Sequence, residues 1–236
     1  LGDVYKRQEA DVILVNTCGF IESAKTEAIE NILEACSYKQ QNPELKVIVT
    51  GCLAERYRSQ IEEEIPEVDA VVGCASNKAI DTIVDRLFHG EDHLESYGAK
   101  KDFPLGGKRV IGTPAHYAYL KIAEGCNNRC HYCAIPAIRG PLRSRDMADC
   151  VAEARWLAGE GVKELIVVAQ DPTAYGEDWG KPGSICELLD KLNKVPGLEW
   201  IRIMYAYPER ITDEFIAAMK RNDKAVSYTH LRAHET

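Results

Sequence analysis

The sequence predicts an α/β protein with two successive domains, each built on a parallel sheet. Short apolar runs alternate with segments of helical periodicity along nearly the whole chain, and short turns separate them. A polar stretch without periodicity, residues 91–113, interrupts this alternation and predicts an interdomain linker. The chain has 236 residues, of which 45% are hydrophobic, so it is long enough to bury two modest cores.

The amino-terminal alternation, residues 9–90, predicts a doubly wound α/β domain. Three apolar runs have the composition of buried parallel strands: residues 11–16, 46–50 and 68–73. A helix is expected after each run: one capped by Ser23, one over residues 55–65 that ends before Pro66, and one opened by Asn77. Because ligands bind at the carboxyl ends of the strands in such sheets, a site is expected at this edge.

The carboxyl-terminal alternation, residues 114–225, predicts the opening βα units of a TIM-type barrel. Its three apolar runs are the expected strands: residues 117–122, 164–169 and 200–205. The expected helices follow them: one capped by Asp146, one over residues 185–192 and one over residues 213–221. Three such units are fewer than a closed barrel needs, so the sequence predicts a partial barrel.

The two ends of the chain, residues 1–8 and 226–236, fit neither pattern and are interpreted as translated adapter sequence. We therefore leave them out of the fold prediction. His230 and His234 are left out with them, although their spacing of one helical turn would otherwise suggest a metal pair. Residues 9–225 are then expected to be part of a longer protein.

Charge and composition exclude several classes of protein. The formal net charge of −8 argues against a strongly basic surface for nucleic acids. No apolar run is long enough to cross a bilayer, and no secretory leader opens the chain, so a cytoplasmic location is expected. Nine cysteines without an export signal favour metal ligation over disulfides.

Three cysteines carry the strongest functional signal. Cys126, Cys130 and Cys133 follow a predicted strand, with three and then two residues between them. Thiolates are the ligands that iron–sulfur clusters need, and a loop with three sulfurs leaves one iron of a four-iron cluster open for chemistry. The alternative is a zinc knuckle or a set of unreactive thiols. His131 is adjacent, but it pairs poorly with Cys130 and Cys133 around one zinc ion.

A second group of cysteines follows the predicted strands of the amino-terminal domain. Cys18, Cys52 and Cys74 fall at the carboxyl ends of these strands, and each of the first two lies beside a glycine. The pattern suggests a second metal site, with buried core thiols as the alternative. The remaining cysteines fall on predicted helices and are expected to pack: Cys36, Cys150 and Cys186.

The spacing of Cys126, Cys130 and Cys133 resembles the signature of the radical S-adenosylmethionine (SAM) superfamily, which usually has an aromatic residue at the position of Tyr132. Further motifs occur in an order that resembles the methylthiotransferases, a radical SAM family with an added amino-terminal cluster domain. These motifs are residues 16–21, 51–52, 117–133, 135–136 with 139–140, 143–145 and 169–171. The resemblance covers nearly all of residues 9–225.

The resemblance implies two [4Fe–4S] clusters. Cys126, Cys130 and Cys133 would bind the cluster that holds SAM and cleaves it by one-electron reduction to a deoxyadenosyl radical. Cys18 and Cys52 would supply two of the three ligands of an auxiliary cluster. The third family ligand lies upstream of the first predicted strand and has no counterpart here, and Cys74 is not a ligand in the family pattern. Both domains would then be incomplete, and this chain alone is expected to be inactive.

The resemblance also implies a substrate. Residues 16–25, 116–121 and 170–173 are similar to the branch that adds a methylthio group to the β-carbon of an aspartate in a small-subunit ribosomal protein. The alternatives are methylthiolation of an adenosine in tRNA, and a non-catalytic zinc or iron–sulfur module. The family further implies a reductant such as flavodoxin or ferredoxin, and ribosome or RNA contact through a TRAM domain that normally follows.

Four polar residues near the predicted strand ends are further candidates for cofactor binding. Arg143 and Arg145 could hold the carboxylate of SAM or of a substrate acid, because a guanidinium pairs well with carboxylates. Surface solvation is their alternative role. Gln170 and Asp171 could contact SAM or substrate, or could shape the turn that contains them.

Overall fold

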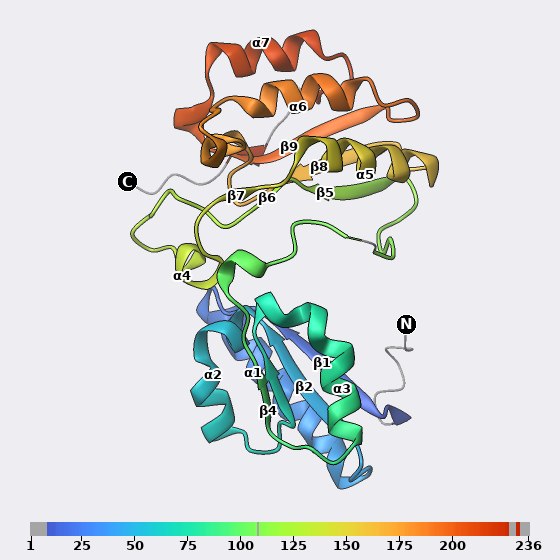
Figure 1. The fold of residues 1–236 in the computed structure, drawn as a ribbon, viewed down its shortest axis with the longest axis vertical. Coiled ribbons are helices and arrows are strands. Elements are labelled where there is room, and N and C mark those ends of the chain that lie inside the picture. The colour runs from blue at the N-terminus through green and yellow to red at the C-terminus, as the bar shows by residue number, and fades with distance from the viewer. Residues whose placement is uncertain (1–8, 108, 227–229, 232–236) are drawn as a thin grey trace. The chain divides into compact units, whose positions relative to one another are not determined.

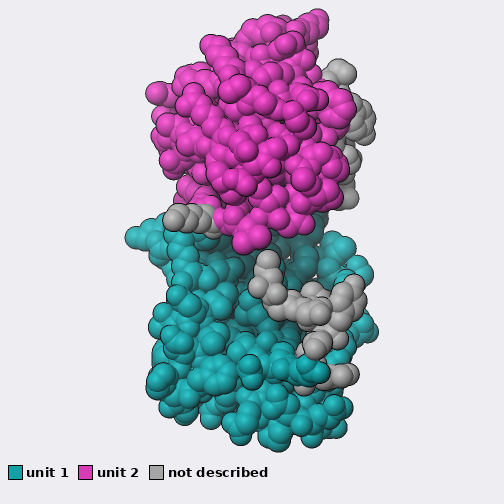
Figure 2. All heavy atoms as spheres, turned by 90° about the vertical axis from the view of Figure 1, so that its right-hand side faces the viewer, with its two compact units in different colours: residues 1–104, 130–139 teal, residues 105–129, 140–236 magenta. Residues whose placement is uncertain are grey.

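The computed structural model describes residues 9–107, 109–226 and 230–231. Its residues form two compact units, coloured separately in Figure 2. The first unit runs to Pro104 and includes Cys130–Arg139, and the second comprises Leu105–Arg129 and the chain from Gly140 onward. The sequence predicts residues 130–139 as part of the second domain, residues 114–225. The grouping differs because α4, Ile135–Arg139, packs against a helix of the first unit.

The amino-terminal unit is built on a parallel sheet of four strands (Figure 1). In sheet order they are β1 (Val12–Thr17), β2 (Lys46–Gly51), β3 (Ala70–Val72) and β4 (Leu94–Ser96). The first three strands confirm the predicted ones. The fourth strand lies within the predicted linker, residues 91–113. Because β4 is only three residues long, it has no recognisable periodicity, yet Leu94 is buried and the strand pairs with β3.

Helices cover both faces of this sheet, as expected of a doubly wound domain. α1 (Glu22–Ser37) and α2 (Cys52–Glu64) pack on the face that carries Val47 and Val49. α3 (Ile80–Phe88) packs on the opposite face, against Ile48 and Val72. Alternate residues of β2 therefore enter different cores, which explains why its central residues 47–49 are all apolar.

The predicted helix starts of this unit are wrong, and glycine geometry explains the most important error. α2 begins at Cys52, three residues before the predicted start, because Gly51 ends β2 with a φ of 101° that an L-residue rarely adopts. Ser23 does not cap α1; the cap position is Ile21, and Ser23 lies inside the first turn. Asn77 lies in a 3₁₀ turn, Cys74–Ala79, that precedes α3.

The carboxyl-terminal unit confirms the three predicted βα units. β5 (Tyr117–Lys121), β8 (Glu164–Val168) and β9 (Trp200–Ala206) are adjacent parallel strands in that order. α5 (Met147–Gly159), α6 (Ser184–Asn193) and α7 (Asp213–Arg221) share a single core with one face of this sheet (Figure 1). Asp146 caps α5 as predicted, because its carboxylate accepts hydrogen bonds from the backbone of Ala148 and Asp149.

The tail excluded from the fold prediction contributes one short strand. β10 (His230–Leu231) pairs in parallel with β9, whose edge offers backbone groups for such pairing. His234 and residues 1–8 lie outside the described residues, so the interpretation of both ends as adapter sequence stays a prediction. None of the helices described is long and apolar enough to cross a membrane.

Candidate metal centre

The loop that carries Cys126 starts from a short antiparallel pair. β6 (Ala123–Glu124) pairs with β7 (Arg143–Ser144), and this pair carries the chain out of the parallel sheet after β5. Glu124 is 2% exposed, and its carboxylate accepts hydrogen bonds from Lys121 at 2.7 Å and from the backbone of Gly125 at 3.2 Å. The entrance to the loop is therefore held by a buried, charge-assisted contact.

Cys126 is the buried cysteine of this loop. It is 4% exposed, its backbone donates to the carbonyl of Gly140, and its sulfur lies 3.5 Å from the backbone nitrogen of Asn128. The Asn127 side chain accepts a hydrogen bond from the backbone of Leu142 at 3.0 Å. Arg129 adopts a left-handed φ of 46°, an uncommon conformation for a residue other than glycine. The loop conformation is therefore specified by contacts on both sides of Cys126.

Gly125 lets this loop approach its neighbours closely, and we expect Gly125→Ala to disrupt it. The residue has a φ of 72°, and a Cβ built there would lie 2.6 Å from the Gly140 carbonyl and closer still to that of Pro141. Gly180 is the matched control, because its φ is 70° but no atom lies within 4 Å of its built Cβ. Gly180→Ala should cost about 1 kcal/mol of unfolding free energy. Gly125→Ala should cost at least twice that and lower the iron bound after reconstitution. Equal losses in both variants would contradict this prediction.

Cys130 and Cys133 belong to the segment grouped with the amino-terminal unit. Both are half-buried, and the backbone of Cys133 donates to the Cys130 carbonyl at 3.0 Å, which closes a turn immediately before α4. Tyr132 is 48% exposed in this turn. Its predicted role beside a cofactor stays a prediction.

Asp171 fixes the loop after β8. It is 1% exposed, and its carboxylate accepts hydrogen bonds from the backbone and hydroxyl of Thr173, which caps the 3₁₀ turn Pro172–Ala174. The other carboxylate oxygen accepts from the side-chain amide of Asn128 at 2.8 Å. Of the two roles considered for Asp171, these contacts match the shaping of the turn and extend it to the cysteine loop. Contact with SAM or substrate stays a prediction for Asp171, as it does for the neighbouring Gln170.

Sequence reasoning missed Arg210, which joins three loops of the carboxyl-terminal unit. Its guanidinium donates to Asp171 at 2.9 Å, Asn128 at 2.8 Å and Glu177 at 2.8 Å. Burial alone would lower the pKa of Arg210, but the hydrogen bond to Glu177 and the charge of Asp171 outweigh burial and raise that pKa. Arg210 lies in the turn Pro208–Arg210, which follows β9. Its position just beyond the carboxyl end of a predicted strand could have marked it as a candidate site residue.

The two arginines proposed from the sequence lie on or beside β7. Arg145 has an 8% exposed side chain and forms an ion pair with Glu153 of α5, which also binds Arg109 at 2.9 Å. This pairing ties β7 to α5, so Arg145 is not the solvated surface residue of the alternative interpretation. Arg143 lies on β7 opposite Glu124. Carboxylate binding by either arginine stays a prediction.

Cys52 and Cys74 lie together at the carboxyl edge of the amino-terminal sheet. Cys52 is the first residue of α2, and Cys74 begins the 3₁₀ turn after β3. Their side chains are hydrogen-bonded, and this bond, followed by burial, raises the pKa of Cys74. The Arg139 guanidinium of α4 lies 3.6 Å from the Cys52 sulfur and 5.8 Å from the ring centre of Phe103. Cys18, by contrast, is exposed.

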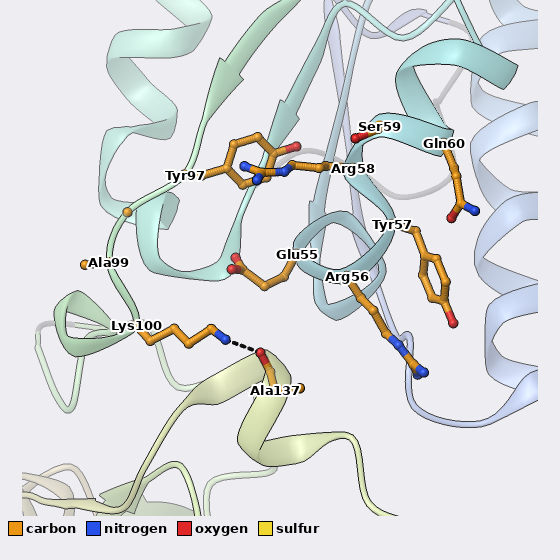
Figure 3. A pocket seen from close by; sticks show the side chains of 11 residues that line it. Glu55, Arg56, Tyr57, Arg58, Ser59, Gln60, Tyr97, Ala99, Lys100 and Ala137 are labelled. Atoms are coloured by element: carbon orange, nitrogen blue, oxygen red, sulfur yellow. Dashed lines mark hydrogen bonds between the residues drawn. The ribbon is translucent and has the colours of Figure 1, made fainter.

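A polar cavity of about 800 Å³ opens beside this cysteine pair, within the amino-terminal unit (Figure 3). Glu55 points into it between Tyr97 and Lys100, and its carboxylate also accepts a hydrogen bond from the backbone of Cys74 at 3.0 Å. Arg58 stacks on the Tyr97 ring at 4.6 Å, and Lys100 donates to the carbonyl of Ala137 in α4. Glu55 therefore links the lining of the cavity to the backbone of Cys74.

The cysteines supply the thiolate ligands that iron–sulfur clusters need. Within the described ranges, no three side chains of His, Cys, Asp or Glu are close enough together to hold a single metal ion. Cys36, Cys150 and Cys186 are buried on α1, α5 and α6, as predicted for packing residues.

Comparison with known proteins agrees with this interpretation. The uncharacterized protein family UPF0004 matches residues 2–73, and the radical SAM superfamily matches residues 120–231. Ribosomal protein uS12 methylthiotransferase RimO of Acetivibrio thermocellus is 49% identical, covering 94% of this chain and 50% of the relative. RimO of Clostridioides difficile is 48% identical with the same coverage. The solved radical SAM methyltransferase TsrM of Kitasatospora setae shares the fold, with a TM-score of 0.63 and 13% identity over 91% of this chain and 46% of that one.

The chain has a radical SAM domain after a UPF0004 domain, and its cysteines have the spacing described above. This is therefore a radical SAM protein. More narrowly, the chain belongs to the radical SAM methylthiotransferase family and is similar to RimO. It spans about half the length of the curated relatives it matches.

Proposed function

We propose that this chain forms the cluster-bearing part of a methylthiotransferase that modifies an aspartate of a small-subunit ribosomal protein. The observation that carries the proposal is the 49% identity to a uS12 methylthiotransferase over 94% of the chain. The three cysteines of the radical SAM signature lie inside the matched region. An adenosine of tRNA as substrate, the alternative considered from the sequence, finds no support in the relatives named above.

Cys126, Cys130 and Cys133 would hold one [4Fe–4S] cluster, and Cys18 and Cys52 would contribute to a second. When bound, such clusters supply the electron that cleaves SAM and carry the sulfur to be inserted. The fold prepares the cysteine loop for cluster binding, because Cys126 is kept from water and Asn128 fixes the loop to Asp171 and Arg210. Because the loop supplies three thiolates, it leaves one iron for the amino and carboxylate groups of SAM.

The substrate chemistry explains why a radical enzyme is needed. The β-carbon of an aspartate is unactivated, so an ordinary acid, base or nucleophile cannot replace its hydrogen. A radical can abstract the hydrogen as a whole atom, which needs no activation of the carbon by neighbouring groups. The cluster that Cys18 and Cys52 would help to hold would supply the sulfur and would take up the electron left over when the carbon–sulfur bond forms. A second SAM would supply the methyl group.

The proposal implies a set of partners and a location. The reaction needs a low-potential electron donor such as flavodoxin or ferredoxin, and its substrate is the ribosomal protein uS12. In the longer protein, a TRAM domain would contribute contacts to the ribosome or to RNA. Because ribosomal proteins and these donors are cytoplasmic, we place the activity in the cytoplasm.

A hybrid enzyme tests the proposal. Residues 9–225 replace the corresponding half of the Acetivibrio thermocellus relative, and the hybrid is reconstituted with iron and sulfide without oxygen. We expect reductive cleavage of SAM and a methylthio group on the aspartate of a uS12 peptide, detected by mass spectrometry. Modification of a tRNA adenosine instead would favour the alternative substrate. Tightly bound zinc without SAM cleavage would favour a non-catalytic module and overturn the proposal.

A further inference from the structure

The polar cavity of the amino-terminal unit has a local positive charge. The described residues that line it include three cations and one carboxylate: Arg56, Arg58, Lys100 and Glu55. The carboxylate is already engaged, since Glu55 accepts the hydrogen bond from the backbone of Cys74. The chain as a whole has a formal net charge of −8, so the cavity is a cationic patch on an acidic protein. Such a patch attracts an acidic partner that the net charge of the chain would otherwise repel.

Arg58 is the cation of this cavity that is best placed to meet a partner. It is exposed, and its guanidinium lies 4.6 Å from the centre of the Tyr97 ring. Stacking on the ring restrains the side chain before a partner arrives, so less conformational freedom is lost on binding. In Figure 3, Glu55 lies between Arg58 and Lys100. Because a guanidinium can donate two hydrogen bonds to one carboxylate, the cavity can receive an aspartate or glutamate side chain of another protein.

The cavity lies next to the segment that carries two of the radical SAM cysteines. Ala137 of α4 lines it, and the carbonyl of Ala137 accepts a hydrogen bond from Lys100. Ala137 is four residues beyond Cys133, so their Cα atoms are at most about 14 Å apart. Cys130 belongs to the same segment, because the backbone of Cys133 donates to its carbonyl. A protein seated over the cavity is therefore close to a cluster that these cysteines hold.

We propose that this cavity is the docking site of an acidic one-electron carrier protein, which reduces the cluster of the Cys126 loop. Electron transfer slows steeply with distance, so a donor has to dock near the cluster that it reduces. The cavity combines this position with a charge opposite to that of the carrier. One electron passes to the cluster, and the carrier leaves oxidised by one electron. The proposal rests on the function proposed above, which needs such a donor.

Binding is measured first, with the hybrid enzyme before reconstitution and a recombinant flavodoxin as the acidic carrier. We expect isothermal titration calorimetry to detect a complex at low salt, and its affinity should fall steeply as sodium chloride is raised. Arg58→Glu should weaken the complex roughly tenfold or more, because it sets a like charge against the carrier. Lys100→Gln removes a charge but keeps a donor for the Ala137 carbonyl, so it should weaken the complex by less.

The matched control is Arg86→Glu, which makes the same change of charge in the same unit. Arg86 lies on α3, which packs on the face of the sheet opposite to α2. Its side chain is 47% exposed and pairs with the exposed Glu91, so the loss of this pair should cost little stability. Arg86→Glu should bind flavodoxin as the parent hybrid does.

Electron delivery is measured second, by comparing two reductants on the reconstituted hybrid. Dithionite is a small molecule that needs no docking site, so Arg58→Glu should cleave SAM with dithionite at the parental rate. With flavodoxin, kept reduced by its NADPH-dependent reductase, the same variant should cleave SAM roughly tenfold more slowly at low salt.

The proposal is wrong if Arg58→Glu binds flavodoxin as the parent does, or if Arg86→Glu weakens binding equally. It is also wrong if Arg58→Glu weakens the binding of inorganic phosphate or ribosomal RNA but not that of flavodoxin, because the cavity would then serve another anion. If dithionite fails to cleave SAM in the parent hybrid, the function proposed above is in error, and the binding measurements still decide whether the carrier docks at the cavity.

Discussion

Cys130→Ala in the reconstituted hybrid enzyme is expected to abolish reductive SAM cleavage. The loop supplies three thiolates, and it contains no other cysteine that could replace the one removed. His131 is adjacent, but a single imidazole next to the vacant position is a poor substitute for a thiolate on an iron–sulfur cluster. We expect the cluster to be lost or degraded and the product 5′-deoxyadenosine to fall below detection by chromatography.

The matched control for this prediction is Cys186→Ala. Cys186 is 3% exposed in α6, where it packs in the core of the carboxyl-terminal unit. Its replacement should reduce stability slightly, since a small buried side chain is lost, but SAM cleavage should continue. Retained cleavage in Cys130→Ala would show that the ligand assignment is wrong. Loss of cleavage in both variants would indicate unfolding rather than ligand loss.

Most of the fold could be predicted because its strands are continuous apolar runs between turns. β1, β2, β5, β8 and β9 all lie where the runs predicted them. β4 could not be predicted, since three residues carry no periodicity and its place is set by pairing with β3. The start of α2 depends on the backbone conformation of Gly51, and sequence patterns carry this information only weakly.

The parts of the candidate site that could be predicted are those formed by residues close together in the sequence. The cysteine spacing and the turn at Asp171 are local features, and both were found. The contacts that organise them are not local: Arg210 reaches Asp171 across 39 positions, and Arg139 reaches Cys52 across 87. A single sequence contains no signal for such pairs, because they arise only when distant loops meet.

Arg210→Ala is expected to destabilise the carboxyl-terminal unit and to loosen the cysteine loop. It would leave the carboxylate of Asp171, which is 1% exposed, without its guanidinium partner. Removing one member of a buried ion pair costs about 3 kcal/mol, the low end of the usual range, because Arg210 itself is 28% exposed. The Asn128 side chain would lose one of its two hydrogen bonds, so we also expect SAM cleavage to fall roughly tenfold. Urea unfolding and the cleavage assay measure the two effects.

Arg221→Ala is the control, because it removes an arginine of the same unit that does not contact the cysteine loop. Arg221 forms a two-pronged ion pair with Asp190 in the same unit, but the pair is exposed, with side chains 45% and 34% accessible. Exposed pairs contribute little, since water solvates both charges when the pair is broken. Arg221→Ala should therefore change neither the free energy of unfolding nor SAM cleavage noticeably.

Arg210→Lys keeps the charge but not the geometry that reaches Asp171, Asn128 and Glu177 together. It should therefore recover stability more than SAM cleavage. Identical behaviour of the two alanine variants would mean that Arg210 does not position the loop.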